Sequence, residues 1–245
     1  MGAVTDASTD AADIPPTYEA YASRTTEPRF TDWLRERSEP AWTAATTHRL
    51  TQQLGAGTLD EAVMSQYLIQ DYAFVDTLVG VFGHAVGDAP SMADKRRLIE
   101  FLDVVTDEEN DYFERSFDAL GVPVDERTDP ELTETTEATI DLLMAAANTG
   151  GYAETLAVLV PAEWVYLTWA SAAADTGDRP EAFYLDEWIE LHANPGFVSF
   201  VNWLRDQLDA VGPTLSARQQ ARVARLFERT AELEVAFFES AYNHA

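Results

Sequence analysis

The spacing of the apolar residues constrains the fold of this chain more than any other feature. These residues recur every three or four positions through eight long segments, which short clusters of glycine, proline or aspartate separate. No segment alternates apolar and polar residues as a half-buried strand does, and no repeat of fixed length is visible. Pro40, inside the first segment, is expected to kink its helix. We predict a single all-α domain of about eight helices, over residues 29–54, 59–86, 91–120, 130–148, 152–174, 181–192, 195–211 and 216–243.

One charged residue stands in the most apolar of these segments. Glu163 lies within the run from Leu156 to Ala174, which is otherwise uncharged, and Pro161 is expected to kink the helix two residues earlier. An ionised carboxylate in such a run needs a partner, water or a ligand, because burying it alone costs several kcal/mol or raises its pKa. Glu163 is therefore a candidate functional residue. The alternative is a structural carboxylate that pairs with an arginine or reaches solvent.

Two further acids stand in apolar stripes at helical spacing. Asp71 shares a stripe with Val75, and Glu234 shares one with Phe238. Together with Glu163, these residues are expected to point three carboxylates at one core. A helical bundle uses interior carboxylates for metal ions, for acid and base chemistry, or for hydrogen bonds to a cationic or amino-bearing ligand. Each acid taken alone can instead lie at a helix end or face a groove.

The histidines give a metal site little support. A bundle that holds two metal ions normally supplies Glu-x-x-His pairs, and none of the four histidines stands in that pairing with a glutamate. Metal chemistry is therefore the runner-up, and we expect no metal and no other cofactor. Aromatic residues on the same helices as the acids would instead line a flat slot for a planar heterocycle, held by stacking and by hydrogen bonds to carboxylates.

The charge balance limits the partners of this chain. It carries 16 lysines and arginines, of which Lys95 is the only lysine, against 43 aspartates and glutamates, and its formal net charge is −27. Nucleic acid and anionic membrane are poor partners for such a surface, so we expect neither. The acids spread along the whole chain and lysine is scarce, which indicates adaptation to molar intracellular salt, where screening weakens self-repulsion.

Composition also indicates the compartment. Cysteine is absent, which excludes disulfides, thiolate metal sites and thiol catalysis. Residues 1–17 are predicted to be a disordered acidic tail ahead of one domain over residues 18–245. The first residues have neither the basic region nor the apolar core of a secretory signal, and we expect no segment that spans a membrane. A cytoplasmic protein is therefore predicted.

Six short stretches occur in an order and spacing that are typical of one family. They are WTAATTH, from Trp42 to His48, and then LGAGTL, YLIQDYAFVDTL, GYAETLAVLVPAEWVYLTWA, WIELHANPGFVSFV and ELEVAFFESAY. In this ordered set the chain resembles the TenA family, also called thiaminase II, over about residues 30–242. The resemblance implies a heme-oxygenase-like helical bundle, a homotetramer and an aminopyrimidine ligand.

The resemblance also implies roles for particular residues. An aspartate in the family's QDY-type helix hydrogen-bonds the aminopyrimidine ring and corresponds to Asp71. A glutamate of the last helix that acts in proton transfer corresponds to Glu234. Phe74 replaces a family tyrosine, His192 replaces a family aromatic residue, and Tyr166 retains a family tyrosine. These three are expected to bind the substrate.

The family's LLPCYW-type motif reads VPAEW in this chain. Ala162 stands in the place of the nucleophilic cysteine, so attack by a thiolate cannot occur. The chain is similar instead to the cysteine-lacking, E-type branch, which is linked to salvage of aminopyrimidine breakdown products of thiamin by hydrolysis of an amino or formylamino group. Glu163 is then the expected general base on water, with Glu234 as the acid. Two alternatives stay open: a metal- or cofactor-dependent oxidase of the same fold, and a non-catalytic pyrimidine-binding or regulatory protein.

Overall fold

Over residues 14–243, which the computed structural model describes, every regular element is a helix. A π-helical turn, η2 (Val105–Glu109), separates α6 from α7, and a short 3-10 helix, η3 (Gly212–Thr214), precedes α13. The prediction of an all-α fold is confirmed. In chain order the α-helices are α1 (Tyr18–Ala22), α2 (Phe30–Arg37), α3 (Ala41–Thr46), α4 (Arg49–Gly55), α5 (Glu61–Asp88), α6 (Met92–Val104), α7 (Asn110–Leu120), α8 (Val124–Thr128), α9 (Glu134–Thr149), α10 (Tyr152–Asp175), α11 (Phe183–Ala193), α12 (Pro195–Val211) and α13 (Ala217–Asn243).

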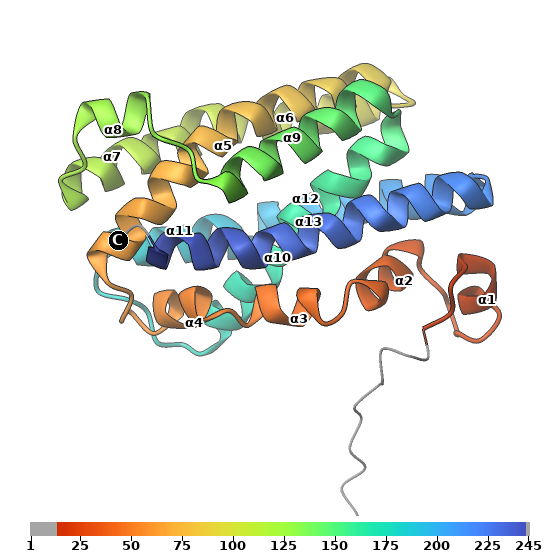
Figure 1. The fold of residues 1–245 in the computed structure, drawn as a ribbon, viewed down its shortest axis with the longest axis horizontal. Helices are drawn as coiled ribbons and strands as arrows, with labels where there is room; N and C mark the ends of the chain where they lie inside the picture. The colour runs from red at the N-terminus through yellow and green to blue at the C-terminus, as the bar shows by residue number, and fades with distance from the viewer. Residues whose placement is uncertain (1–13, 244–245) are drawn as a thin grey trace, which may run out of the picture.

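The helices are arranged in layers around α10 (Figure 1). α10 packs against α11, α12 and α13, and it also contacts α5 and α9. On one side lie α5 and α9 together with α6 and α7, and on the other side lie α2, α3 and α4. One apolar core therefore runs through the bundle, with α10 at its centre.

α10 is apolar around its whole circumference, which explains its central place. Its residues from Leu156 to Val160 are fully buried, and Glu154 and Glu163 are the charged residues among its buried side chains. Pro161 lies inside the helix without ending it. Contrary to the expectation from the sequence, α10 has the length and apolarity of a membrane span. However, 61% of its most apolar window is buried inside the bundle, as in the core helix of a globular domain.

Polar side chains fix the helix turns that frame the site. Asn194 accepts a hydrogen bond from the Phe197 N–H at 2.9 Å, which starts α12 directly after α11. Gln70 of α5 accepts the N–H of Thr133 at 2.9 Å and the hydroxyl of Thr136 at 2.7 Å. These bonds tie the start of α9 to the turn of α5 that also carries Asp71.

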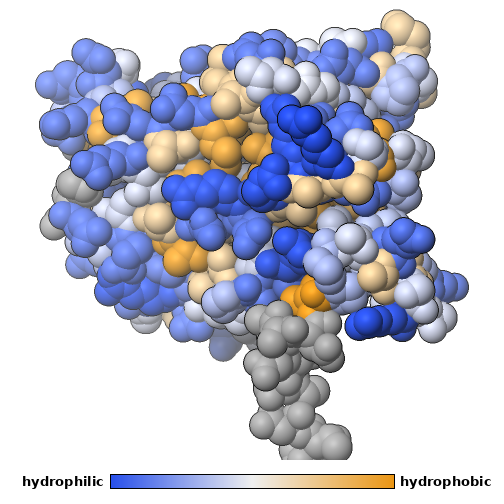
Figure 2. All heavy atoms as spheres, turned by 45° about the vertical axis from the view of Figure 1, so that its right-hand side comes forward, coloured by the Kyte–Doolittle hydropathy of each residue, from blue (hydrophilic) through white to orange (hydrophobic). Residues whose placement is uncertain are grey.

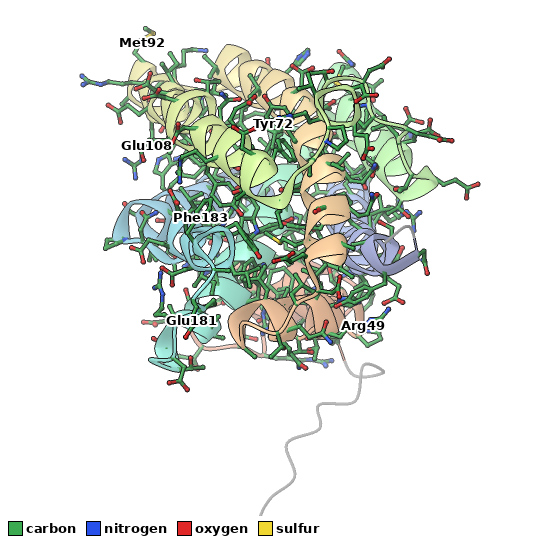
Figure 3. The ribbon with its side chains drawn as sticks, turned by 90° about the vertical axis from the view of Figure 1, so that its left-hand side faces the viewer. Arg49, Tyr72, Met92, Glu108, Glu181 and Phe183 are labelled. Carbon is green, nitrogen blue, oxygen red and sulfur yellow. The ribbon has the colours of Figure 1, made fainter. Side chains whose placement is uncertain are left out.

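The segment predicted as one helix over residues 91–120 contains the π-helical turn η2. A π turn accommodates one residue more than an α-helical turn, and such turns are frequent at functional sites. The hydroxyl of Tyr72 on α5, a residue labelled in Figure 3, donates to Asn110 Oδ1 at 2.9 Å, directly after the turn. This bond ties η2 to α5, the helix that carries Asp71.

The first predicted helix, over residues 29–54, is wrong because the segment forms three helices. α2 ends at Arg37, Pro40 immediately precedes α3, and His48 starts α4 by accepting the Leu50 N–H at 3.2 Å. Pro40 therefore stands at a break rather than a kink, since its nitrogen has no proton to donate. The short helices α1 and α8 were also not predicted, so the described residues hold more helices than the eight expected.

Part of the predicted N-terminal tail lies against the bundle. Ile14 packs on the apolar core, the Trp33 indole N–H donates to the Pro15 carbonyl at 2.9 Å, and Thr17 starts α1. Residues 1–13 lie outside the described residues. The predicted disorder of that part of the tail therefore stays a prediction.

Candidate active site

Three carboxylates from three helices line one interior cavity. Asp71 comes from α5, Glu163 from α10 and Glu234 from α13, and their exposed fractions are 4%, 7% and 5%. Among residues 14–243 none of the three forms an ion pair, and the one hydrogen bond to them is a long contact from the Tyr166 hydroxyl to Asp71 Oδ1, at 3.5 Å. We call this space the inner cavity. The helical stripes of the sequence thus bring the three acids together.

Burial and mutual repulsion make these acids weak. Burial raises the pKa of Glu163 well above its usual value, and the charges of Glu109, Glu234 and Asp71 add to that rise. Burial, with a further contribution from Asp71, raises the pKa of Glu234 to about 8. The pKa of Asp71 is also raised, mainly by burial and then by Glu109, although the nearby hydroxyls of Tyr166 and Tyr67 oppose the rise. At neutral pH Glu234 is therefore mainly protonated and able to donate a proton.

A relay of hydroxyls leads to Asp71. The Trp188 indole N–H donates to the Tyr67 hydroxyl at 3.1 Å, and the Tyr67 and Tyr166 hydroxyls lie 2.9 Å apart. When Tyr166 donates to Asp71, its oxygen accepts from Tyr67, and every hydroxyl in the relay has a partner. The relay fixes the Tyr166 ring and places one donor on the Asp71 carboxyl.

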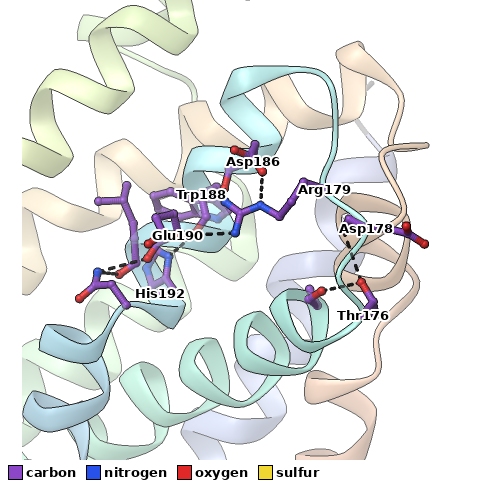
Figure 4. Close-up of polar contacts among 10 residues, drawn as sticks. Thr176, Asp178, Arg179, Asp186, Trp188, Glu190 and His192 are labelled. Carbon is purple, nitrogen blue, oxygen red and sulfur yellow. Dashed lines mark hydrogen bonds and ion pairs between the residues drawn. The ribbon is translucent and has the colours of Figure 1, made fainter.

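His192 and Phe74 supply ring surface to the inner cavity. His192 is buried, and its Nδ1 lies 2.9 Å from the Trp188 carbonyl, so Nδ1 must carry the proton (Figure 4). Burial lowers the pKa of His192 to about 4, so the ring is neutral at physiological pH. Its centroid lies 4.9 Å from that of Tyr166, next to the acids. His192 therefore contributes a neutral ring to the cavity.

The loop before α11 is fixed from outside the cavity. Arg179 hydrogen-bonds the Asp186 carboxylate and donates to Glu190 Oε2 at 3.2 Å, on the exposed side of α11 (Figure 4). Asp186 and Glu190 belong to the same helix as Trp188 and His192. These ion pairs fasten the outer face of α11, whose inner face carries the cavity rings.

The position of the missing cysteine also borders the inner cavity. Ala162 lines it, with an exposed fraction of 5%, directly before Glu163. A methyl group offers no nucleophile, so any chemistry at this wall of the cavity falls to the neighbouring carboxyl.

Sequence reasoning missed one acid of the site, Glu109. This half-buried residue ends η2 and lines the inner cavity with Asp71, Glu163 and Glu234. Burial raises the pKa of Glu109 to about 7. A signal existed in the sequence, because Glu109 follows Val105 by four residues and precedes Tyr112 by three, on the same stripe.

A second, wider space adjoins the inner cavity. The inner cavity measures about 40 Å³, and this outer pocket, between α6, η2, α11 and α12, measures about 310 Å³. Phe101, Glu109, His192 and Phe197 border both. Together the two spaces reach the lower end of the range of small-molecule sites, which begins at about 300 Å³.

A metal centre in a helical bundle needs several histidine, aspartate or glutamate side chains that converge on one point. Within residues 14–243 there is no group of three or more histidine, aspartate or glutamate side chains that could hold a metal ion.

The interior of this helical bundle brings carboxylates and aromatic rings together in one cavity. This chain belongs to the TENA/THI-4/PQQC family, whose model matches residues 35–244. The aminopyrimidine aminohydrolase of Halalkalibacterium halodurans is 26% identical to it over 218 residues, which cover 87% of this chain and 96% of that protein.

Solved structures agree on the fold. The TenA homologue of P. horikoshii is 24% identical, with a TM-score of 0.78 over 89% of this chain and all of the other. A domain with a heme oxygenase-like fold from Shewanella denitrificans is 14% identical, with a TM-score of 0.64 over 89% of this chain and 94% of the other. The predicted heme-oxygenase-like architecture and the resemblance to TenA proteins are therefore confirmed.

Proposed function

We propose that this chain is an aminopyrimidine aminohydrolase that acts in thiamin salvage. It hydrolyses the amino or formylamino group of an aminopyrimidine breakdown product of thiamin, and carboxylates take the place of a cysteine. The observation that carries the proposal is the convergence of Asp71, Glu163 and Glu234 on one ring-lined cavity. The family membership and the activity named for the Halalkalibacterium relative support the choice of substrate.

Ring recognition falls to Asp71 and the aromatic side chains. An aminopyrimidine offers ring nitrogens that accept hydrogen bonds and an amino group attached directly to the ring that donates them, and a carboxyl can meet both needs at one edge. Tyr166 already contacts Asp71 and would hold that carboxyl in place. Tyr166, Phe74 and His192 line the same cavity and provide faces for the flat ring.

Glu163 and Glu234 carry the proton transfers of the hydrolysis. A water oxygen bonds to the exocyclic carbon while the C–N bond breaks, and the electron pair of that bond goes to the nitrogen. Glu163 takes one proton from the water, and Glu234 gives one proton to the departing nitrogen, so a hydroxymethylpyrimidine and ammonia form. The raised pKa of Glu234, about 8, keeps it protonated near neutral pH, as this acid role requires.

A substrate panel and one matched pair of variants test this function. Purified protein in concentrated KCl is incubated with aminomethylpyrimidine and with its formyl derivative, and released ammonia and formate are measured. Glu163→Gln is expected to lose at least a hundredfold in kcat, a typical loss for a general base. Glu154→Gln is the control, because Glu154 is equally buried on α10 but lies outside the cavity, where it accepts the Gly151 N–H at 3.2 Å and pairs with Arg222 at 4.0 Å.

Two results would contradict the proposal. Full activity of Glu163→Gln at saturating substrate would remove Glu163 from the reaction. Thermal stabilisation of the wild-type protein by the pyrimidines without any turnover would identify a binding protein instead.

We further propose a cytoplasmic homotetramer adapted to high salt. Its support is the net charge of −27 and a surface on which hydrophilic residues surround small apolar areas (Figure 2). On α6, Met92, Ile99 and Val104 are exposed, with Met92 at 78%, and such side chains are suited to contacts between subunits (Figure 3). Light scattering after size exclusion in low and molar KCl measures the assembly, and a monomer in both would contradict it.

A further inference from the structure

Glu109 stands where the inner cavity meets the outer pocket. It lines both spaces, and it is half-buried, whereas the other three acids are buried. Among residues 14–243 its carboxylate has no hydrogen-bond or ion-pair partner. The π turn η2 delivers this side chain inward, and Tyr72 anchors the residue that follows it. Glu109 is therefore free to meet a ligand that extends from one space into the other.

The lining of the inner cavity favours a cationic ligand group. Four carboxyl groups line it, from Asp71, Glu109, Glu163 and Glu234, and its lining contains neither lysine nor arginine. His192 is neutral at physiological pH because burial lowers its pKa to about 4. Glu163 and Glu234 are both more than nine-tenths buried and have no hydrogen-bond partner among the described residues. A cationic group entering this cavity would find unpaired acceptors on several sides.

We infer that Glu109 is the residue that selects an amine substrate. Its carboxylate accepts a hydrogen bond from the departing aminomethyl nitrogen of the aminopyrimidine, in the ammonium form of that group. This inference rests on the proposed function. Glu109 lies where the inner cavity opens to the outer pocket, so a substituent that a bound ring directed toward this opening would meet its carboxylate.

This role of Glu109 is compatible with the proposed hydrolysis, which needs no reagent besides water. Glu234 gives its proton to the exocyclic amine, which becomes an ammonium group, and the Glu109 carboxylate accepts a hydrogen bond from it. The C–N bond then breaks as water adds to carbon, its electron pair stays on nitrogen, and Glu163 keeps the proton lost by the water. Ammonia leaves past Glu109 into the outer pocket. Glu109 touches the reacting nitrogen but keeps no proton at the end of the cycle.

The test compares amine and neutral substrates in matched variants. Glu109→Gln keeps the size of the side chain and removes its charge, and Asp107→Asn removes a charge from the same turn at an exposed residue that lines neither space. For aminomethylpyrimidine we expect Glu109→Gln to raise KM roughly tenfold to a hundredfold, the range of one charge-assisted hydrogen bond. For the neutral formylamino derivative we expect KM to change less than about twofold, because no ammonium is present.

Several outcomes overturn the inference. An equal rise in KM for both substrates would assign Glu109 a general role in shaping the cavity. If Asp107→Asn raised KM for the amine by the same factor, the effect would come from the overall negative charge of the turn and not from a contact with Glu109. Glu109→Ala is measured alongside and must show the same preference, so that a folding defect of one variant does not decide the result.

Failure of the proposed function gives a different pattern. If the wild-type protein turns over neither substrate, the proposed function fails, and binding is measured instead by thermal shift with aminomethylpyrimidine and hydroxymethylpyrimidine. Glu109 remains the amine-binding residue if Glu109→Gln loses the shift with the amine alone. The inference is wrong if both shifts are unchanged.

Discussion

Replacement of Glu234 by glutamine is expected to stabilise the protein increasingly as pH rises, while it removes activity. Glu234 is 5% exposed, and burial together with Asp71 raises its pKa from 4.5 to about 8. Below pH 4.5 the carboxyl is protonated in both the folded and the unfolded chain, so it exerts no pH-dependent effect. Above that pH the unfolded chain loses its proton while the folded chain retains it, and the free energy of unfolding falls until the folded carboxyl also ionises near pH 8.

The size of the effect follows from the shift. At about 1.4 kcal/mol for each pKa unit, the ceiling is about 5 kcal/mol, of which about 3 kcal/mol develops between pH 5 and pH 8. Glu234→Gln cannot ionise and escapes this loss. In a chain of this length each kcal/mol shifts Tm by about 2 to 4 °C, so the Tm advantage of the variant should grow by about 6 to 12 °C over that interval.

Thermal unfolding at constant KCl concentration measures this difference at each pH. Glu232→Gln is the control on the same helix, because Glu232 is exposed and pairs with Arg229 at 2.8 Å. A surface pair of this kind contributes at most about 1 kcal/mol, so its loss should change Tm far less than the loss of the Glu234 charge. A Tm difference between Glu234→Gln and the wild-type protein that stays constant with pH would refute the reasoning.

Two further predictions concern packing and titration. Gly212→Ala should destabilise the protein by about 1 to 3 kcal/mol in urea unfolding, because a Cβ at Gly212 would overlap the Phe30 ring. Gly80→Ala, with open space around its Cβ, should be neutral or stabilising. Equal stabilities of the two variants would contradict this prediction. His192→Phe should leave the shape of the profile of kcat/KM against pH unchanged between pH 6 and 8. The reason is that burial lowers the pKa of His192 to about 4, so its ring stays neutral in this range. Loss of an inflection near pH 6.5 in the variant would show that His192 titrates in the active protein.

Much of the fold followed from apolar spacing, because a long helix that buries one face repeats that face every three or four residues. Apolar spacing predicted the wrong helix bounds where a helix ends but the apolar stripe continues across the break. Between residues 29 and 54 the apolar residues continue at helical intervals, although Pro40 and the His48 cap divide the segment into α2, α3 and α4. The position of such a break depends on which backbone N–H groups find hydrogen-bond acceptors, and the spacing of apolar residues does not indicate this.

The candidate site was accessible to the same reasoning in part. Asp71, Glu163 and Glu234 lie on regular α-helices, so their stripes predicted where their side chains point, and the structure places all three on one cavity. Glu109 lies on a π turn, and whether such a turn forms is decided by tertiary packing rather than by local pattern. The roles assigned to these residues remain predictions for the experiments above.

The π turn gives its segment one residue more than a regular α-helix would hold. Deletion of Glu109 would therefore let η2 close into an α-helical turn, and Tyr112, Phe113 and Phe117 of α7, which are fully buried, would keep their phase in the core. The acid between the two spaces would be lost while the fold stayed the same. In this part of the chain, relatives that lack the inward acid can therefore be one residue shorter without any change of architecture.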